Sequence, residues 1–229
     1  ADGDFVVAWA RQGANGSDSF WGVQARRFTA GGTPAGAAFQ VNTFTSSFQR
    51  LPAIASDPEG DFVVVWQSVG SAGNDNSEYS VQGQRYTSAG TATGGEFQVN
   101  TYTSSFQSTA AIGAGGDGSF VVAWDSMGSG EGDNSETSVH AQRFSAAGVA
   151  QGSEFQVNAY STNYQWLPAV AVDGEGDFVV VWQSMGASSG DTAGYSLHAQ
   201  RYSAAGTALG DPFQVNSYTT SDQTASAVA

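Results

Sequence analysis

The sequence predicts an all-β protein built as a propeller-like ring of four blades, and three observations carry this prediction. A unit of about 58 residues is written four times, because Phe-Gln-Val-Asn begins at positions 39, 97, 155 and 213. Gly or Pro interrupts every stretch of about ten residues, and no segment has the apolar spacing of a helix. Each unit also contains four short segments rich in β-branched and aromatic residues, which is typical of a propeller blade.

The second unit shows the four expected strands in order. Phe62–Trp66 is apolar without alternation, which indicates a strand that is covered on both faces. A polar loop over 68–80 leads to the mixed strand Val81–Tyr86. The short alternating strand Glu96–Asn100 follows, and Ala110–Ile112 is the fourth strand. The same order in each unit predicts blades of about 58 residues with four strands each.

The two ends of the sequence predict how the ring closes. The first unit has no counterpart of the strand Pro52–Ala55, and Ser226–Ala229 has the matching composition. We therefore expect Ser226–Ala229 to complete the first blade by pairing with Phe5–Trp9, which would leave no exposed sheet edge. The alternatives are a fragment of a larger ring, an open array of two-sheet modules, and two chains that complete one larger ring.

The unbroken period also predicts a single repeat domain over 1–229. The expected repeats cover about 1–56, 57–114, 115–172 and 173–229.

Composition excludes several classes of function. The chain has 21 acidic residues against seven basic ones and a net charge of −14, so nucleic acids and anionic membranes are not expected partners. No Cys is present, which excludes disulfides and thiolate metal sites. No apolar run reaches the length of a membrane span. Low charged content and abundant small polar residues favour an exported bacterial protein, secreted or on the cell surface.

The repeated motifs resemble a family of tandem repeats in large exported bacterial proteins. These motifs are Gly-x-Phe-Val-Val-x-Trp, Ala-Gln-Arg-Phe/Tyr and Glu-Phe-Gln-Val-Asn-Thr, and they cover the whole chain. The resemblance implies a type I-secreted or adhesin-like parent protein, in which such repeats accompany calcium-binding and cadherin-like modules. This sequence departs from the family pattern because it lacks the Gly-Gly-x-Gly-x-Asp nonapeptide of the calcium-binding repeats.

The sequence offers no catalytic motif. The two histidines, His140 and His198, occupy one repeat position that holds Gln24 and Gln82 in the other units, which indicates a polar strand position. A serine-nucleophile elbow, a zinc-protease motif and a phosphate loop are all missing. We therefore expect no enzyme, although a pair of carboxylates that cleaves glycosidic bonds would leave no linear motif.

Two polar residue types recur in every unit and are interpreted as structural. An Arg precedes Phe or Tyr in each unit, and we expect its guanidinium to bind carbonyl or acidic groups of a neighbouring blade. A Gln precedes each short inner strand, and we expect it to form hydrogen bonds between blades. These residues are Arg27, Arg85, Arg143 and Arg201, and Gln49, Gln107, Gln165 and Gln223.

The long loops carry the residues that suit a metal. Only a hard cation such as Ca²⁺ fits a set of oxygen ligands without His or Cys. The tight Asp/Gly segments 57–61 and 173–177 are interpreted as hairpin turns instead. The candidate calcium ligands are Asp75, Asp133, Asp191, Glu78 and Glu136.

Aromatic residues in the same loops suggest a binding surface. In a propeller these loops share one face, where aromatic rings can stack on sugars and polar groups can bind their hydroxyls. The candidate ligand-binding residues are Phe20, Trp21, Tyr79, Tyr195, Tyr102 and Tyr160.

Together these features predict an extracellular, non-catalytic recognition or adhesion module that binds a glycan or another surface component. The first alternative is a structural repeat of a filament, surface layer or giant adhesin, with copies of itself as partners. The second alternative is a glycoside hydrolase that uses carboxylates of the loop face. No cofactor is required by the sequence, and Ca²⁺ is the cation that its loops suit.

Overall fold

The computed structural model describes residues 3–13, 20–70, 78–128, 136–186, 194–224 and 226–229. The chain forms two compact units, Ala1–Ser104 (unit 1) and Ser105–Ala229 (unit 2). The single repeat domain predicted over 1–229 stays a prediction.

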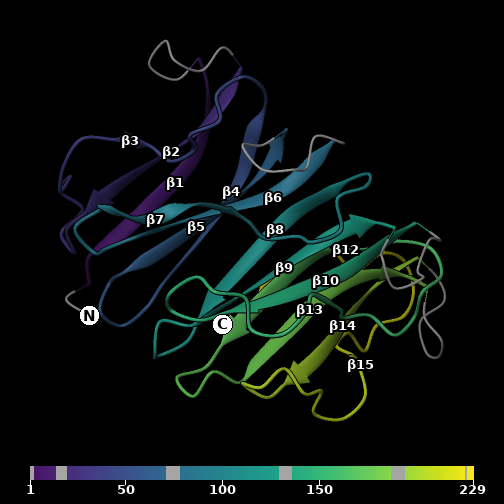
Figure 1. Cartoon of the computed structure of the whole chain (residues 1–229). Helices are drawn as coiled ribbons and strands as arrows, with labels where there is room; N and C mark the ends of the chain where they lie inside the picture. Colours follow the sequence, from purple (N-terminus) through teal and green to yellow (C-terminus); the bar gives the residue numbers. More distant parts are fainter. Residues whose placement is uncertain (1–2, 14–19, 71–77, 129–135, 187–193, 225) are drawn as a thin grey trace. The chain divides into compact units, whose positions relative to one another are not determined.

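The described residues of unit 1 form two antiparallel sheets (Figure 1). The strand order is β1-β2-β3 in the first sheet and β4-β5-β6-β7 in the second. The strands are β1 (Phe5–Gln12), β2 (Trp21–Phe28), β3 (Phe39–Gln40), β4 (Gln49–Ser56), β5 (Phe62–Val69), β6 (Tyr79–Tyr86) and β7 (Ala92–Gln98).

Unit 2 contains two four-stranded antiparallel sheets, in which consecutive strands are neighbours. The first sheet consists of β8 to β11 and the second of β12 to β15. Their bounds are β8 (Gln107–Ala114), β9 (Phe120–Met127), β10 (Thr137–Phe144), β11 (Phe155–Gln156), β12 (Gln165–Val172), β13 (Phe178–Met185), β14 (Tyr195–Tyr202) and β15 (Phe213–Gln214).

The predicted all-β, propeller-like fold class is confirmed. All elements of the described residues are strands, and each sheet is a meander of antiparallel strands that follow one another in the chain. Each full sheet begins at the strand that contains the recurring Gln, as at Gln49, rather than at the repeat boundary expected near residue 57. None of the segments that the structure describes is a helix long and apolar enough to cross a membrane.

The strand that was to close the ring does not form in the described residues at the end of the chain, and the closure itself stays a prediction. The sheet of β1 has three strands, and the described residues 226–229 form no strand. Every ladder in the described ranges joins strands that follow one another in the chain. The repeat therefore predicted which segment matches the missing strand, but local hairpins rather than long-range pairing form the sheets.

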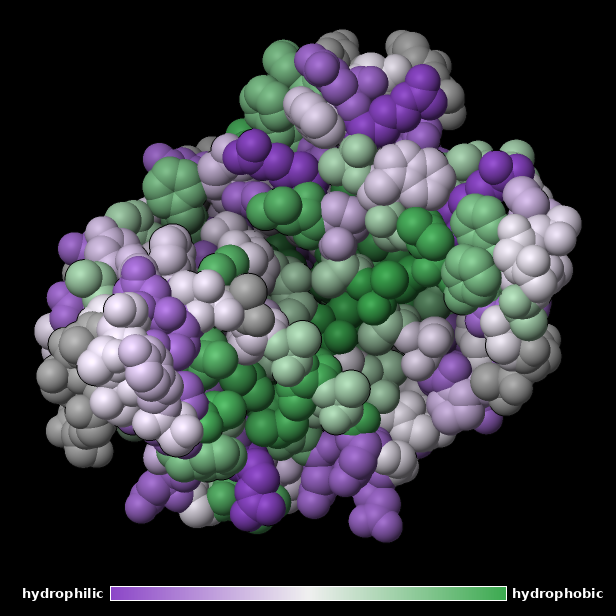
Figure 2. Space-filling view, turned by 180° about the vertical axis from the view of Figure 1, so that it is seen from behind, coloured by the Kyte–Doolittle hydropathy of each residue, from purple (hydrophilic) through white to green (hydrophobic). Residues whose placement is uncertain are grey.

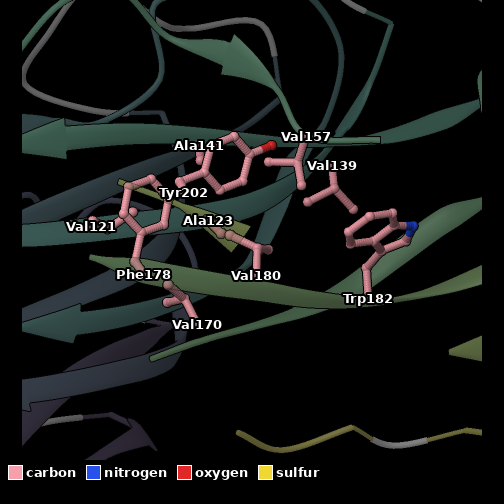
Figure 3. Close-up of a cluster of buried hydrophobic side chains, with 10 residues drawn as sticks. All are labelled: Val121, Ala123, Val139, Ala141, Val157, Val170, Phe178, Val180, Trp182 and Tyr202. Carbon is pink, nitrogen blue, oxygen red and sulfur yellow. The ribbon is translucent and has the colours of Figure 1, made fainter. Parts of the chain in front are cut away.

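Each unit has a core between its two sheets. In unit 2, Val139, Ala141 and Val157 of one sheet pack against Phe178 and Trp182 of the other. Figure 3 shows these side chains pointing toward one another, together with the remaining members of the cluster. In unit 1, the equivalent cluster joins Val23, Ala25 and Val41 to Phe62, Val64, Trp66 and Tyr86.

The hydrogen bonds of the recurring Asn explain why the Phe-Gln-Val-Asn motif is present in each unit of the repeat. Asn158 Oδ1 accepts a hydrogen bond of 2.7 Å from the backbone N–H of Val139, and Asn158 Nδ2 donates to Tyr160 O at 2.9 Å. Asn42, Asn100 and Asn216 accept the equivalent bond from Val23, Val81 and Leu197. The side chain thus replaces a backbone partner where the short strand ends.

The repeat position shared by Gln and His is a polar strand position, as the sequence indicates. His140 Nε2 lies 3.0 Å from Ser138 Oγ, and Gln82 Nε2 donates to Ser80 Oγ at 2.9 Å. The ring of His140 also stacks on Trp124, with centroids 6.2 Å apart. Both side chain types therefore make the same contact within their sheet.

Candidate functional site

One repeat position carries a carboxyl group in a single blade. The sixth residue of β9 is Asp125, and the equivalent residues of β5 and β13 are Gln67 and Gln183. All three side chains are buried, and Asp125 is 7% exposed. Asp125 departs from the repeat, because the equivalent position of the neighbouring blades holds a neutral amide. The fold therefore does not require a carboxyl group at this position.

The surroundings of Asp125 favour its protonated form. Ser108 Oγ in the adjacent strand β8 lies 2.6 Å from Asp125 Oδ2, and no regular hydrogen bond reaches Oδ1 among the described residues. Burial raises the pKa of Asp125. Hydrogen bonds to Ser108, to Thr109 and to the backbone of Leu167 lower it, but they do not reverse the rise. The carboxyl therefore holds its proton to higher pH than an exposed Asp does.

A bulge in β12 brings a second sheet against Asp125. The register of β12 against β13 shifts between Trp166 and Ala169, and Leu167 has a φ of 50°. A positive φ is unfavourable for a Leu, so the conformation is imposed by the bulge. The backbone of Leu167 makes a hydrogen bond to Asp125, and Trp166 is the residue before Leu167 in β12.

Aromatic rings from β12, β14 and the preceding loop gather around Trp166. The ring centroid of Trp166 is 5.7 Å from that of Tyr195, in a stacked arrangement, and 6.1 Å from that of Tyr164. Tyr164 is exposed, whereas Trp166 and Tyr195 are half-buried. These rings form a surface with apolar faces open to solvent, which suits stacking on a sugar.

A second carboxylate adjoins the aromatic group. Tyr164 donates a hydrogen bond to the Glu136 carboxylate, and this bond raises the pKa of Tyr164. Glu136 precedes β10, the strand that pairs with β9 at Asp125 through Val139. We call Asp125, Glu136, Tyr164, Trp166 and Tyr195 the unit 2 site.

Unit 1 has a different group at the equivalent place. Arg50 occupies the position of Trp166, and its guanidinium lies 5.1 Å from the ring centroid of Tyr79 and 5.9 Å from that of Phe48. Arg50 also donates to the Tyr79 hydroxyl, and Phe20 contacts Phe48 with centroids 5.2 Å apart. This arrangement fixes the aromatic rings around a cation, which leaves their faces less available for a sugar.

The structure thus divides the predicted ligand-binding residues between the units. Phe20, Trp21 and Tyr79 lie in unit 1, where Trp21 bridges to Phe48, whereas Tyr195 joins the unit 2 site. Tyr102 and Tyr160 are half-buried, and Tyr160 Oη would be 3.3 Å from a Cβ placed on Gly186.

The predicted calcium ligands are mostly outside the described residues. Asp75, Asp133 and Asp191 lie in the ranges that the structure does not describe. Glu78 is exposed, and Glu136 binds Tyr164. The described ranges contain no group of three or more His, Cys, Asp or Glu that could hold a metal ion.

Two of the recurring Arg residues, Arg27 and Arg143, contact the next sheet of their own unit. Arg27 Nη1 donates to Ala89 O at 2.7 Å, and Arg143 Nη1 donates to Ala205 O at 2.6 Å. Both residues are half-buried, as is Arg85, whereas Arg201 is exposed. The partners of Arg27 and Arg143 are backbone carbonyls, which agrees with the contact expected between blades.

Three of the recurring Gln residues bind the Asn that lies seven positions earlier in the chain. Gln165 Oε1 accepts from Asn158 Nδ2 at 3.2 Å, and Gln223 Oε1 accepts from Asn216 Nδ2 at 2.8 Å. Gln49 accepts the same bond from Asn42 at 3.4 Å. Gln49, Gln107 and Gln165 are fully buried, and Gln223 is half-buried.

Sequence reasoning missed Asp125, Tyr164, Phe48 and Arg50. The signal for Asp125 was present, because it replaces a Gln that recurs in β5 and β13. Arg50 and Trp166 carry a similar signal, since Ser108 stands at their position in β8. The sequence contains no local signal that predicts the long-range contacts between these residues.

Comparisons with known proteins identify the fold and no family. No family model and no curated protein matches the chain. A protein of unknown function from Dyadobacter fermentans has a TM-score of 0.53 and 12% identity over 79% of this chain and 46% of its own length, so this chain spans less than half of it. An α-L-arabinofuranosidase from Lactobacillus brevis has a TM-score of 0.53 and 13% identity, over 95% of this chain and 75% of that one. A GH43 endo-arabinanase from Bacillus licheniformis follows with a TM-score of 0.49 and 12% identity, over 95% and 78%.

These comparisons correct two expectations. One is that the chain is a non-catalytic recognition or adhesion module, and the other is that it is not an enzyme. The finding that overturns them is the likeness in fold to the arabinofuranosidase, since this propeller-like fold carries glycoside cleavage in that protein. The reasoning was wrong because it relied on linear motifs. Carboxylates that cleave a glycosidic bond converge from separate segments and leave no such motif.

Proposed function

We propose that this chain is a glycoside hydrolase that cleaves its substrate at the unit 2 site. The observation that carries the proposal is Asp125, a buried carboxyl with a raised pKa that interrupts an otherwise neutral repeat position. A carboxyl that stays protonated near the working pH is what a general acid needs, and burial is the usual means of raising its pKa.

The aromatic surface supplies the binding step. The faces of Tyr164, Trp166 and Tyr195 offer apolar area for the carbon-bearing face of a sugar ring. The Glu136 carboxylate and the Tyr164 hydroxyl, already joined by a hydrogen bond, are positioned to bind sugar hydroxyl groups beside these rings. Binding here would place a glycosidic bond next to β8 and β12.

Proton donation is the step assigned to Asp125. Because Asp125 is 7% exposed and Ser108 is half-buried, the Ser108 hydroxyl connects the carboxyl with the substrate. Asp125 gives its proton to Ser108 Oγ, and the Ser108 hydroxyl proton passes to the glycosidic oxygen as the bond to the anomeric carbon breaks. Glu136, as the second carboxylate, stabilises the positive charge on the sugar and activates the incoming water or attacks the anomeric carbon itself.

The substrate class to test first is an arabinose-containing polysaccharide. Support comes from the fold likeness to the L. brevis α-L-arabinofuranosidase, which covers 95% of this chain. The proposal includes a secreted or cell-surface location in a bacterium, for which the acidic, Cys-free and Lys-free composition is the support.

The test is release of reducing sugar by the purified chain from arabinan and a panel of other polysaccharides. General acid catalysis contributes about 10²–10⁴-fold, so Asp125→Asn should lower the rate by at least about 100-fold. Asp117→Asn is the matched control, because Asp117 is an exposed carboxylate in a turn of the same unit, and it should retain activity within about twofold.

Two results would contradict the proposal. One is that the parent chain releases no sugar from any polymer of the panel. The other is that Asp125→Asn, with an unchanged circular dichroism spectrum, is as active as the parent.

A further inference from the structure

Three repeat positions in one sheet of unit 2 hold residues that differ from their equivalents in the other four-stranded sheets. On the face that Figure 2 shows, hydrophobic and hydrophilic residues lie side by side, so hydropathy alone does not single out a site. Departures from the regular pattern of a fold are expected at functional sites. At the positions of Ser108, Thr109 and Asp125, the sheet of β4 holds Arg50, Leu51 and Gln67, and the sheet of β12 holds Trp166, Leu167 and Gln183.

Asp125 lies on the side of β9 that faces the second sheet of unit 2. Val121 and Ala123 belong to the apolar cluster between the two sheets (Figure 3). Alternate residues of a strand share one side, so Asp125 follows Val121 and Ala123 on that side. A hydrogen bond from the backbone of Leu167, in the second sheet, reaches the carboxyl of Asp125. All these groups belong to unit 2, and the carboxyl is held between its two sheets.

Thr109 adopts a backbone conformation that its side chain disfavours. The register of β8 against β9 shifts between Ser108 and Ala111, and Thr109 has a φ of 50° within this shift. Leu51 and Leu167 have φ values of 52° and 50° at the same position, so the repeat imposes this backbone. A positive φ is uncommon for residues other than Gly and is a genuine outlier for a β-branched residue. Because the backbone disfavours Thr at this position, its presence points to a role for its hydroxyl.

The Thr109 hydroxyl reaches both members of the pair formed by Ser108 and Asp125. Thr109 Oγ1 donates to Ser108 Oγ at 3.5 Å, and it also makes a hydrogen bond to the Asp125 carboxyl. Ser108 Oγ lies 2.6 Å from Asp125 Oδ2. A hydroxyl rotates to suit its partners, so Thr109 can donate to Ser108 while the carboxyl is protonated and to Asp125 once the carboxyl is ionised.

We propose that Thr109 is a positioning residue of the unit 2 site, which holds the Asp125 carboxyl against Ser108 and donates to it when its proton has left. The inference rests on the proposed function, in which Asp125 is the general acid. No bond of Thr109 breaks, because its hydroxyl keeps its own proton and only changes its acceptor. This role accounts for a Thr at a strained position and for three residues that differ together from their equivalents.

The test is Thr109→Val, which keeps the β-branched shape and removes the hydroxyl. Loss of a hydrogen bond to the ionised carboxyl should lower kcat at least about tenfold. The KM should stay within about twofold of the parent value, because the lost contact belongs to the proton donor and not to the aromatic surface that binds the sugar.

The pH profile gives a readout that a purely structural role of Thr109 would not move. Burial raises the pKa of Asp125, and the Thr109 hydroxyl is among the groups that oppose this rise, so its loss should raise the pKa further. A general acid must be protonated, and the high-pH limb of the rate profile should therefore move to higher pH in Thr109→Val. Thr109→Ser is the matched control, because it keeps the hydroxyl, and it should retain both the limb and kcat within about threefold.

Titration of the Asp125 carboxyl carbon by NMR separates this inference from the proposed function. The signal is identified by its absence in Asp125→Asn, and its midpoint should lie at higher pH in Thr109→Val than in the parent and in Thr109→Ser. A parent chain that cleaves no polysaccharide would contradict the proposed function, and the titration would still show whether Thr109 holds the carboxyl. An active parent together with a Thr109→Val variant of the same kcat and pH profile, or an unchanged midpoint in Thr109→Val, would overturn the role of Thr109.

Discussion

Ser108 Oγ lies 2.6 Å from Asp125 Oδ2, and this pair joins the edge strand β8 to the buried strand β9. The equivalent pairs are Arg50 with Gln67 and Trp166 with Gln183. The fold therefore accepts three chemically different pairs at one place. The pair in β8 and β9 is the one of the three that contains a buried acid.

Stability should reveal the raised pKa of Asp125. In the folded chain the carboxyl keeps its proton to higher pH than in the unfolded chain, so the unfolded state binds fewer protons between the two pKa values. The stability that this group contributes is present below its usual pKa of 3.8 and is lost as the pH rises through the raised value.

Asp125→Asn removes this cost while keeping the shape of the side chain. We expect the variant to melt above the parent at neutral pH, by about 2–4 °C for each kcal/mol recovered, with the difference shrinking as the pH falls. Asp117→Asn should behave oppositely, since hydrogen bonds from Ser119 lower the pKa of Asp117. A parent and an Asp125→Asn variant with the same melting temperature from pH 3 to 8, a range of about five units, would exclude a raised pKa.

The contact of Arg143 with Ala205 should contribute to stability. Arg143→Ala leaves the Ala205 carbonyl without its 2.6 Å partner and exposes the turn at Gly206. Because Arg143 is half-buried, we expect a loss of about 1–2 kcal/mol in the free energy of unfolding by urea. Arg201→Ala, at the equivalent but exposed position, should change that free energy by less than about 0.5 kcal/mol. Equal losses in both variants would show that the contact between sheets is not the cause.

The Asn that ends each short strand should matter in proportion to its burial. Asn158→Ala strands the buried N–H of Val139 and removes the bonds to Tyr160 and Gln165, so we expect a loss of at least about 2 kcal/mol in urea unfolding. Asn216 makes the equivalent bonds at a half-exposed place, and Asn216→Ala should cost clearly less, because water can replace them. The prediction fails if Asn216→Ala is the more damaging change.

The positions of the strands could be predicted from the sequence, because the runs of Val, Phe and Trp and the turn glycines are local signals that recur four times. The strand over Phe62–Trp66 was expected and lies within β5. The shared role of His140 and Gln82 followed from the repeat alone, since a position that accepts both residues needs only a polar side chain. The same regularity misled the assignment of function, because a repeat emphasises what every blade needs and conceals the single residue that differs.

Tertiary structure decided which of these residues meet and which stay apart. Asp125 is acidic in the sequence, but its raised pKa arises from burial in the folded chain, and the backbone of Leu167, 42 positions further along the chain, is among the hydrogen-bonding groups that oppose the rise. Ser226–Ala229 has the composition of a first strand, yet no strand forms there in the described residues. Periodicity reports which segments can pair and which faces are apolar. Burial, pKa and the partner of an edge strand depend on contacts between distant segments, and packing alone determines those contacts.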